Sequence, residues 1–222
     1  MDLLAPGLAL VFDMDGVIVD SNPVHREAWT AFNRRFGVAT TEAMQQRMYG
    51  KRNDEIIRDF FGAGLPPEEI ARRGAAKEEM YRSMIAGRIE EILVPGLRAL
   101  LARYRAAPMA LASNAEPENV AFLLDRAGLR PYFQVLVDGH QVRHPKPDPE
   151  IYRRAAELLS VPPADCIVFE DSYAGVDAAR AAGTRVVGIR TTHATLPGAD
   201  LTVDNFLSEE LSAWLAAQNR AA

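Results

Sequence analysis

The chain has 222 residues, of which 48% are hydrophobic, so it can bury the core of one large domain or of a domain with an insert. Its formal net charge of -5 argues against a broad basic surface and against nucleic acid as a partner. The single cysteine, Cys166, excludes an intrachain disulfide, and its apolar neighbours predict that it is buried packing. We find no signal-peptide pattern and no apolar run near the ~20 residues of a membrane span, so we expect a soluble, cytoplasmic protein with no membrane partner.

Short apolar runs recur along the chain, and helical patterns separate them. Such runs are typical of parallel strands buried on both faces, and their alternation with helices predicts an α/β fold with a mainly parallel sheet. The predicted strands are residues 8–12, 109–112, 135–137, 167–169 and 186–189, and 201–203 could add an edge strand. Residues 208–218 predict a closing helix, with Ser208 as N-cap and Glu209 and Glu210 in its first turn.

Residues 23–85 interrupt this alternation, because they contain helical patterns and no strand pattern. The helical patterns cover residues 23–36, 53–61 and 66–85, and glycines at positions 37, 50, 62 and 64 separate them. An all-helical block inserted after the first strand predicts a cap over the C-terminal edge of the sheet. Open α/β sheets bind their ligands at that edge.

Two carboxylates end the first predicted strand, in the segment Asp13-Met14-Asp15-Gly16. Gly16 allows a sharp turn, so Asp15 can face the same pocket as Asp13. One carboxylate can act as a nucleophile that forms an aspartyl-phosphate, and the other as a general acid and base. Taken alone, the pair is equally compatible with a metal site or a helix-capping turn.

Two further motifs can hold a phosphate group. Ser113 and Asn114 follow the strand at 109–112, where a hydroxyl and a backbone N–H can bind phosphate oxygens. Taken alone, they are better explained as the N-cap of a helix that starts near Pro117. Lys146 lies between two prolines that stiffen the backbone, and its ammonium could stabilise a transferring phosphoryl group. Taken alone, it is better explained as a solvated lysine in a turn.

The fourth motif is Glu170-Asp171, directly after the strand at 167–169. Carboxylate oxygens are the protein ligands that Mg²⁺ prefers, together with water and phosphate oxygens. Asp171 could also cap the helix that follows, and this alternative is compatible with metal binding.

With these four motifs in this order, the chain resembles the haloacid dehalogenase superfamily of phosphotransferases over nearly its whole length. The resemblance implies a Rossmann-like core, residues 1–18 and 90–222, with the site at its C-terminal edge, and a small α-helical cap, residues 19–89. It also implies that Asp13 is the nucleophile and Asp15 the general acid and base. Ser113, Asn114 and Lys146 would bind the phosphoryl group. Mg²⁺ would be held by the Asp13 carboxylate, the Asp15 backbone carbonyl and Asp171, with Glu170 nearby through water.

The implied reaction has two steps. Asp13 attacks phosphorus in line while Asp15 protonates the leaving alcohol, and Asp15 then takes a proton from the water that hydrolyses the aspartyl-phosphate. Mg²⁺ and Lys146 would offset charge on the phosphoryl oxygens. Dehalogenases of the same superfamily need no metal, so Asp15 and the Glu170-Asp171 pair favour the phosphate branch.

Within the superfamily, the chain resembles the branch of β-phosphoglucomutase and sugar-phosphate phosphatases. Asp20-Ser21 matches the hinge between core and cap in that branch. His25 matches a histidine that lies near the general acid and base, and Lys77 matches a cap lysine that senses the substrate. The alternative for His25 is a polar residue on an exposed helix face, and for Lys77 a solvated lysine in a charged helix. We expect the cap to move on linkers at residues 17–21 and 86–95.

Two departures from the mutase pattern favour hydrolysis. A mutase holds the non-reacting phosphate with a second basic cluster, to which Arg52 can contribute only if its loop is one residue shorter than in the mutase. Glu116 stands where the mutase has lysine, and a carboxylate repels a dianionic phosphate. Lys51, Arg52 and Lys77 still suggest that the cap-facing end of the substrate is polar or anionic.

We therefore predict a Mg²⁺-dependent phosphatase that acts on a small phosphorylated metabolite, a sugar phosphate. The alternative is a sugar phosphomutase of the β-phosphoglucomutase type. A non-catalytic phospholigand-binding protein is more remote, because it would be expected to lack a motif carboxylate or the lysine, and all are present. We expect a monomer, since a mobile cap needs clearance.

Overall fold

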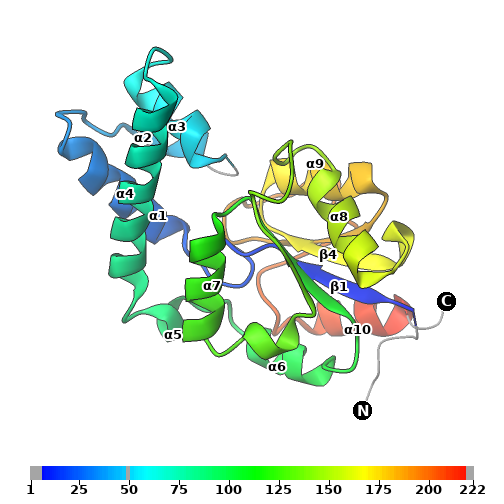
Figure 1. Ribbon diagram of the computed structural model, residues 1–222. Helices are drawn as coiled ribbons and strands as arrows, with labels where there is room; N and C mark the ends of the chain where they lie inside the picture. The colour runs from blue at the N-terminus through cyan, green and yellow to red at the C-terminus, as the bar shows by residue number, and fades with distance from the viewer. Residues whose placement is uncertain (1–6, 49–50, 219–222) are drawn as a thin grey trace.

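The computed structural model describes residues 7–48 and 51–218, and it contains a six-stranded parallel sheet (Figure 1). The strands lie in the order β3-β2-β1-β4-β5-β6, and β1 pairs with both β2 and β4. Their bounds are β1 (Ala9–Phe12), β2 (Met109–Ala112), β3 (Val135–Val137), β4 (Cys166–Glu170), β5 (Arg185–Ile189) and β6 (Leu201–Val203). The predicted α/β fold and all six predicted strands are confirmed.

The strand order reverses beside β1. The chain moves outward from β1 through β2 and β3, and it then returns to place β4 on the other side of β1. The loops that leave β1 and β4 therefore run apart and open a crevice at the C-terminal edge of the sheet. Asp13 follows β1 and Glu170 ends β4, so two of the predicted site residues lie at this crevice.

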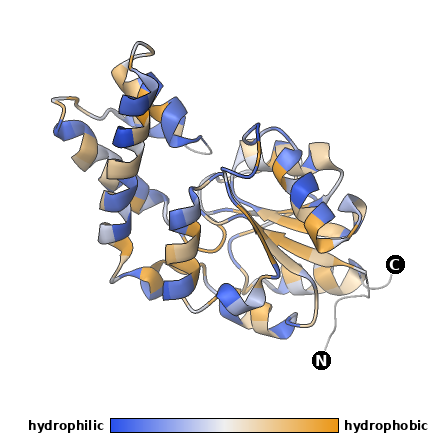
Figure 2. Cartoon of the chain, viewed as in Figure 1, coloured by the Kyte–Doolittle hydropathy of each residue, from blue (hydrophilic) through white to orange (hydrophobic). Residues whose placement is uncertain are grey.

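Helices cover both faces of the sheet, because apolar side chains alternate toward each face along every strand. Leu10 and Phe12 share a buried cluster with side chains of α6, α7 and α10, whereas Val11 shares one with α8 and α9. Figure 2 shows the strands as mostly hydrophobic and the helices around them as mixed. The bounds are α6 (Leu97–Arg103), α7 (Pro117–Arg126), η1 (Arg130–Tyr132), α8 (Glu150–Leu159), η2 (Pro163–Asp165), α9 (Tyr173–Ala182) and α10 (Glu209–Gln218).

A helical block lies to one side of the sheet (Figure 1). It contains α1 (Asn22–Arg34), α2 (Glu42–Met48), α3 (Asn53–Phe61) and α4 (Pro67–Ile85), and α5 (Ile89–Ile92) follows it. The helical block has a hydrophobic cluster of its own, which contains Trp29, Phe32 and Ile57 and is separate from the two clusters of the sheet. No strand lies among the described residues of 23–85, as predicted. The sequence patterns missed α2, because Met48 is its only buried residue.

Two linkers join the helical block to the sheet, and they run side by side. The backbone N–H of Val94 donates to the carbonyl of Ile18 (3.1 Å), and that of Asp20 donates to the carbonyl of Ile92 (2.7 Å). These residues fall within the predicted linkers, 17–21 and 86–95. These two hydrogen bonds tie the linkers to each other.

Two smaller predictions are also confirmed. The Ser208 hydroxyl accepts a hydrogen bond from the Leu211 backbone N–H (3.2 Å), so Ser208 caps α10. Cys166 is 1% exposed and packs against the α8 and α9 side of the sheet. In the part of the chain that the structure describes, every helix is too short or too polar to cross a membrane.

Candidate active site

The loop after β1 carries Asp13 and turns sharply at Gly16. The backbone N–H of Asp13 donates to the carbonyl of Phe169 (3.1 Å), which fixes the Asp13 carboxylate at the sheet edge. Gly16 has a φ of 81°, and a Cβ built there would lie 1.9 Å from an oxygen of Asp171. Only glycine combines this backbone conformation with so close an approach, and it brings the two strand ends together.

Lys146 is buried between two carboxylates. Its ammonium donates to Asp13 Oδ1 (2.8 Å), to Glu170 Oε1 (2.6 Å) and to the carbonyl of Ala112 (3.1 Å). These three acceptors use all three ammonium protons. Burial opposes the charged form, but Asp13 and Glu170 outweigh it and raise the pKa of Lys146. The alternative of a solvated lysine is therefore wrong, and Lys146 is a fixed cation beside Asp13.

Glu170 is fully buried and holds Lys146 from the other side. Its Oε1 accepts from Lys146 and from the hydroxyl of Tyr152 (2.5 Å). Its Oε2 accepts from the backbone N–H groups of Asp171 (2.9 Å) and Ser172 (3.2 Å) and from the Ser172 hydroxyl (3.1 Å). Burial opposes ionisation, yet Lys146 and these donors lower the pKa of Glu170. The carboxylate is thus charged and has donors at both oxygens.

Tyr152 was not predicted as a site residue. It lies on the buried face of α8 with Ile151, Ala155 and Ala156, and the apolar pattern of that face predicts only packing. Its ring also faces the Lys146 ammonium, which lies 4.8 Å from the ring centroid. The only signal in the sequence is a hydroxyl on an otherwise apolar helix face, because a buried tyrosine needs a hydrogen-bond partner.

Asp13, Glu170 and Asp171 form a cluster in which one carboxylate oxygen of each residue lies within 4.8 Å of those of the other two. Burial, opposed by Lys146, raises the pKa of Asp13 to about 7. Burial and the charges of Glu170 and Asp13 also raise the pKa of Asp171. One ammonium faces three carboxylates here, so the cluster has an excess of negative charge. A divalent cation with oxygen ligands would compensate it, and the residues present therefore fit Mg²⁺.

Asp171 does not cap the helix that follows it. The N-cap of α9 is Ser172, whose side chain accepts from the backbone N–H of Gly175 (3.1 Å). Asp171 Oδ2 instead accepts from the Thr192 hydroxyl and the Asn22 amide (3.4 Å). The capping alternative is therefore wrong, and the carboxylate stays available at the crevice.

Asp15 is held by two donors at the base of the helical block. Its Oδ1 accepts from the Ser21 hydroxyl (2.5 Å) and lies 3.3 Å from His25 Nε2. On the other side of the ring, His25 Nδ1 lies 3.3 Å from the Lys77 ammonium. A lysine can only donate, so Nδ1 accepts and Nε2 carries the proton that faces Asp15. Burial alone would raise the pKa of Asp15, but His25 and Ser21 outweigh it and lower that pKa.

His25 and Lys77 are not surface residues. The His25 ring stacks on Tyr81 with 3.8 Å between centroids, so the alternative of an exposed polar residue is wrong. Lys77 is 2% exposed and forms an ion pair with Glu78 (2.5 Å), so the alternative of a solvated lysine is also wrong. Neither residue type nor spacing signalled Glu78 as the partner.

Ser113 and Asn114 lie in the loop after β2 and face the same crevice. Ser113 Oγ accepts from the backbone N–H of Ala115 (3.2 Å), and Asn114 Oδ1 accepts from the backbone N–H of Lys146 (3.3 Å). Helix α7 begins at Pro117, and Glu116 occupies its N-cap position without a side-chain cap. The N-cap interpretation of Ser113 and Asn114 is therefore wrong.

A cavity of about 480 Å³ lies between the sheet edge and the helical block. Nine of the predicted site residues line it, namely Asp13, Asp15, His25, Arg52, Lys77, Ser113, Asn114, Lys146 and Asp171. Glu170 is the exception, because it lies beneath Lys146. The cavity therefore joins residues of all four sequence motifs to side chains of the helical block.

Arg52 reaches from the helical block to the sheet side of the cavity. Its guanidinium donates to the carbonyls of Gly139 (2.6 Å) and Val142 (3.2 Å), which belong to the loop after β3. The predicted residue is thus at the cavity, and one of its three guanidinium nitrogens already donates to these two carbonyls of the same chain.

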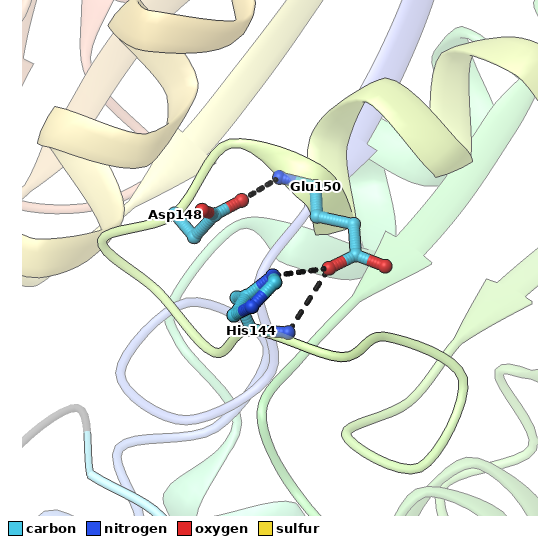
Figure 3. Close-up of side chains that lie close together, drawn as sticks. All are labelled: His144, Asp148 and Glu150. Carbon is cyan, nitrogen blue, oxygen red and sulfur yellow. Dashed lines mark hydrogen bonds and ion pairs between the residues drawn. The ribbon is translucent and has the colours of Figure 1, made fainter.

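Three further side chains cluster on the surface of the Lys146 loop: His144, Asp148 and Glu150 (Figure 3). Their contacts have a structural explanation. Glu150 accepts from the backbone N–H groups of Arg143 (3.1 Å) and His144 (3.0 Å), and Asp148 accepts from the backbone N–H of Glu150 (2.9 Å). These bonds close the loop over the start of α8 and thereby help to fix Lys146.

The chain is similar to known proteins over most of its length. The family model described as haloacid dehalogenase-like hydrolase matches residues 8–183. The chain is 34% identical to fructose-1-phosphate phosphatase YqaB of Escherichia coli (82% of this chain, 95% of the relative) and 31% identical to β-phosphoglucomutase of Bacillus subtilis (88% of each). The crystal structure of β-phosphoglucomutase from Clostridium difficile superposes on this chain with a TM-score of 0.85 and is 26% identical to it. The superposition covers 96% of this chain and 99% of the other.

Proposed function

This chain belongs to the haloacid dehalogenase-like hydrolase family, and on that premise we propose that it is a Mg²⁺-dependent phosphatase of small sugar phosphates. The observation that carries the proposal is the position of Asp13. Its carboxylate lies at the cavity, is bound by the Lys146 ammonium, and adjoins the Asp171 carboxylate. The names of the relatives, a fructose-1-phosphate phosphatase and a β-phosphoglucomutase, support a sugar phosphate as substrate.

In the first step, Asp13 attacks phosphorus and Asp15 protonates the oxygen of the leaving alcohol. The P–O bond to the alcohol breaks as the bond to Asp13 forms, which gives an aspartyl-phosphate. Lys146 stabilises the negative charge on the phosphoryl oxygens, since its ammonium is fixed 2.8 Å from the nucleophile. Ser113 and Asn114 bind the same oxygens from the loop after β2.

In the second step, Asp15 accepts a proton from water, and the oxygen of that water attacks the phosphorus. The bond to Asp13 breaks and inorganic phosphate leaves. The lowered pKa of Asp15 favours the carboxylate form that this step needs. The dianionic phosphate of the substrate raises that pKa again by repulsion, which favours the protonated form for the first step.

We propose that Asp13 and Asp171 hold Mg²⁺ directly, with the backbone carbonyl of Asp15, as the family resemblance implies. The metal would supply positive charge that offsets the charge on the phosphoryl oxygens. Glu170 supports the site indirectly, because its two oxygens already accept five hydrogen bonds. We assign it to the position of Lys146 and to a water-mediated contact with the metal.

Hydrolysis is favoured over transfer between sugar hydroxyls because cations of the helical block already bind other groups of the protein. A mutase would need free cations to hold a second phosphate. Of the three cations that the helical block places at the cavity, Lys77 is paired with Glu78, and Arg52 donates through one nitrogen to two carbonyls of the sheet side. Only Lys51 is left for a second phosphate, together with the remaining donors of Arg52. The β-phosphoglucomutase-type reaction is therefore the second candidate, carried by the similarity to that enzyme.

We further propose that residues 19–89 act as a cap over a core of residues 1–18 and 90–222. Closure of the cap on the paired linkers would exclude bulk water during the first step. A monomer leaves the cap the clearance that this motion needs.

Phosphate release from p-nitrophenyl phosphate and from a panel of sugar monophosphates, with Mg²⁺ and with EDTA, tests the proposal. We expect turnover only with the metal, and Asp13→Asn should lower kcat by about 10³-fold or more. Asp125→Asn on the exposed surface of α7 is the matched control and should leave kcat unchanged. Turnover by Asp13→Asn at the rate of the control would overturn the assignment of the nucleophile.

A further inference from the structure

The end of the cavity remote from Asp13 has no surplus of positive charge. Three cations of the helical block line this end, namely Lys51, Arg52 and Lys77. Three carboxylates balance them, Asp54 and Glu78 of the same block and Glu116 of the loop before α7. Resting on the function proposed above, we infer that Glu78 and Glu116 restrict the substrate to monophosphates whose far end carries neutral hydroxyl groups, and that they reject a second phosphate.

The positive charge of Lys77 is compensated by a carboxylate of the protein itself. Its ammonium lies 2.5 Å from Glu78 Oε1 and 3.3 Å from His25 Nδ1, and it faces the Trp29 ring at 5.0 Å from the centroid. With 2% of its surface exposed, it has a carboxylate, a nitrogen acceptor and an aromatic face around it. A second phosphate would have to displace Glu78 before this lysine could bind it.

Glu78 cannot turn away easily, because two amides fix it. Asn53 of α3 donates to Oε1 (2.7 Å), and Asn119 of α7 donates to Oε2 (2.6 Å). Asn119 in turn accepts from Arg82 (2.8 Å). Glu78 is 4% exposed, so removing its partners would leave a buried charge without compensation.

Asn53 also links Glu78 to Glu116. The same amide nitrogen donates to Glu116 Oε1 (2.9 Å), so a side chain of the helical block is bonded to the loop before α7. Glu116 Oε2 has no hydrogen-bond partner among residues 7–48 and 51–218. This oxygen belongs to a cavity-lining side chain and is an acceptor without a donor.

These contacts define what the far end can recognise. A carboxylate oxygen accepts hydrogen bonds and cannot donate them, so Glu116 can bind a hydroxyl of the substrate. A phosphate dianion brings only acceptors and negative charge, and juxtaposed like charges strongly oppose binding. The selection therefore rests on repulsion of the wrong ligand as well as on binding of the right one.

A matched pair of substrates tests the inference: fructose 1-phosphate and fructose 1,6-bisphosphate, which differ only at carbon 6. We expect kcat/KM of the wild type to favour the monophosphate by at least about tenfold. Glu116→Lys should lower this ratio at least about tenfold, through a lower KM for the bisphosphate, and Glu116→Gln should give an intermediate ratio.

Glu118→Lys is the control, because it makes the same change of charge two residues along, on an exposed side chain outside the cavity. We expect its ratio to equal that of the wild type. The inference is wrong if the wild type treats both substrates alike, or if Glu116→Lys changes the ratio no more than Glu118→Lys does.

Binding separates this inference from the proposed function. Calorimetric titration of Asp13→Asn with each sugar phosphate measures the preference without turnover. Absence of hydrolysis by the wild type would contradict the proposed function, but the binding ratio and its response to Glu116→Lys would still decide the inference. Hydrolysis of both substrates with equal affinity would overturn the inference and leave the proposed function standing.

Discussion

The hydroxyl of Tyr152 donates to Glu170 Oε1 over 2.5 Å, and the same oxygen accepts from the ammonium of Lys146. Tyr152 thereby acts on Asp13 through two intermediaries, since Lys146 joins Glu170 to the proposed nucleophile. The position of the ammonium depends on this chain of contacts, in which every member is buried.

Tyr152→Phe removes the hydroxyl and keeps the ring. Glu170 then loses one of two donors on Oε1, so we expect kcat to fall roughly tenfold with little change in KM. The free energy of unfolding should fall by about 1–3 kcal/mol, because a buried hydrogen bond to a charged group is lost. Steady-state kinetics and thermal unfolding measure both effects. Tyr132→Phe, outside the cavity, should leave kcat unaltered; equal kcat for the two variants would refute the positioning role.

Gly16→Ala should abolish most activity and destabilise the fold. The new methyl group would overlap an oxygen of Asp171, and the φ of 81° adds strain, so we expect a loss of about 3 kcal/mol or more. Gly37→Ala is the control, with a φ of 71° and no atom within 4 Å of the new Cβ. It should cost only about 1–2 kcal/mol and keep full activity. Similar losses in both variants would show that the close approach to Asp171 is unimportant.

The stability of the metal-free protein should fall as the pH rises. The pKa of Asp13 is raised from 3.8 to about 7, so between these values the folded protein binds more protons than the unfolded chain. By linkage, this lowers the free energy of unfolding from about pH 5.5 to pH 7 by roughly 2 kcal/mol, or about 4–8 °C in Tm. Asp171 also has a raised pKa, so it adds a fall of the same sign. Asp15 and Glu170 have lowered pKa values, and their contributions are already constant in this window.

Melting curves in EDTA across this pH range measure the effect. Asp13→Asn should show a smaller fall in Tm, because the titrating group is absent. Added Mg²⁺ should restore the wild-type Tm at the high end of the range, since the metal binds the deprotonated carboxylates. A Tm that drops equally in the wild type and in Asp13→Asn would rule out Asp13 as the cause.

The protein should not interconvert glucose 1- and 6-phosphates efficiently. Glu116 repels a second phosphate, and Lys77 is already paired with Glu78, so a bisphosphate should not stay bound long enough to reorient. Incubation with β-glucose 1-phosphate and a glucose bisphosphate primer should release free phosphate as the main product. Rapid formation of glucose 6-phosphate with little free phosphate would reverse the choice between hydrolase and mutase.

The sequence by itself determined the six strands and the residues at their ends. Strands buried on both faces are continuous apolar runs, and a polar residue that ends such a run lies at the edge of the sheet. The positions of Asp13, Ser113 and Asp171 around one cavity therefore follow from local pattern combined with parallel topology. Lys146 lies within the long loop after β3, and its contacts with Asp13 and Glu170 place it. The family resemblance added the roles of these residues.

Only the tertiary structure decided what the cations of the site bind. The sequence left open whether Lys77 is a cap lysine that senses substrate or a solvated residue of a charged helix, and the structure buries it against Glu78. Arg52 bonds to a carbonyl 87 positions away, and Asn53 bonds to Glu116 across 63 positions. Hydrophobic periodicity shows which face of an element is buried, but it does not encode which polar groups meet when distant segments pack. That packing settled whether each charge is free for a ligand or already neutralised by the protein.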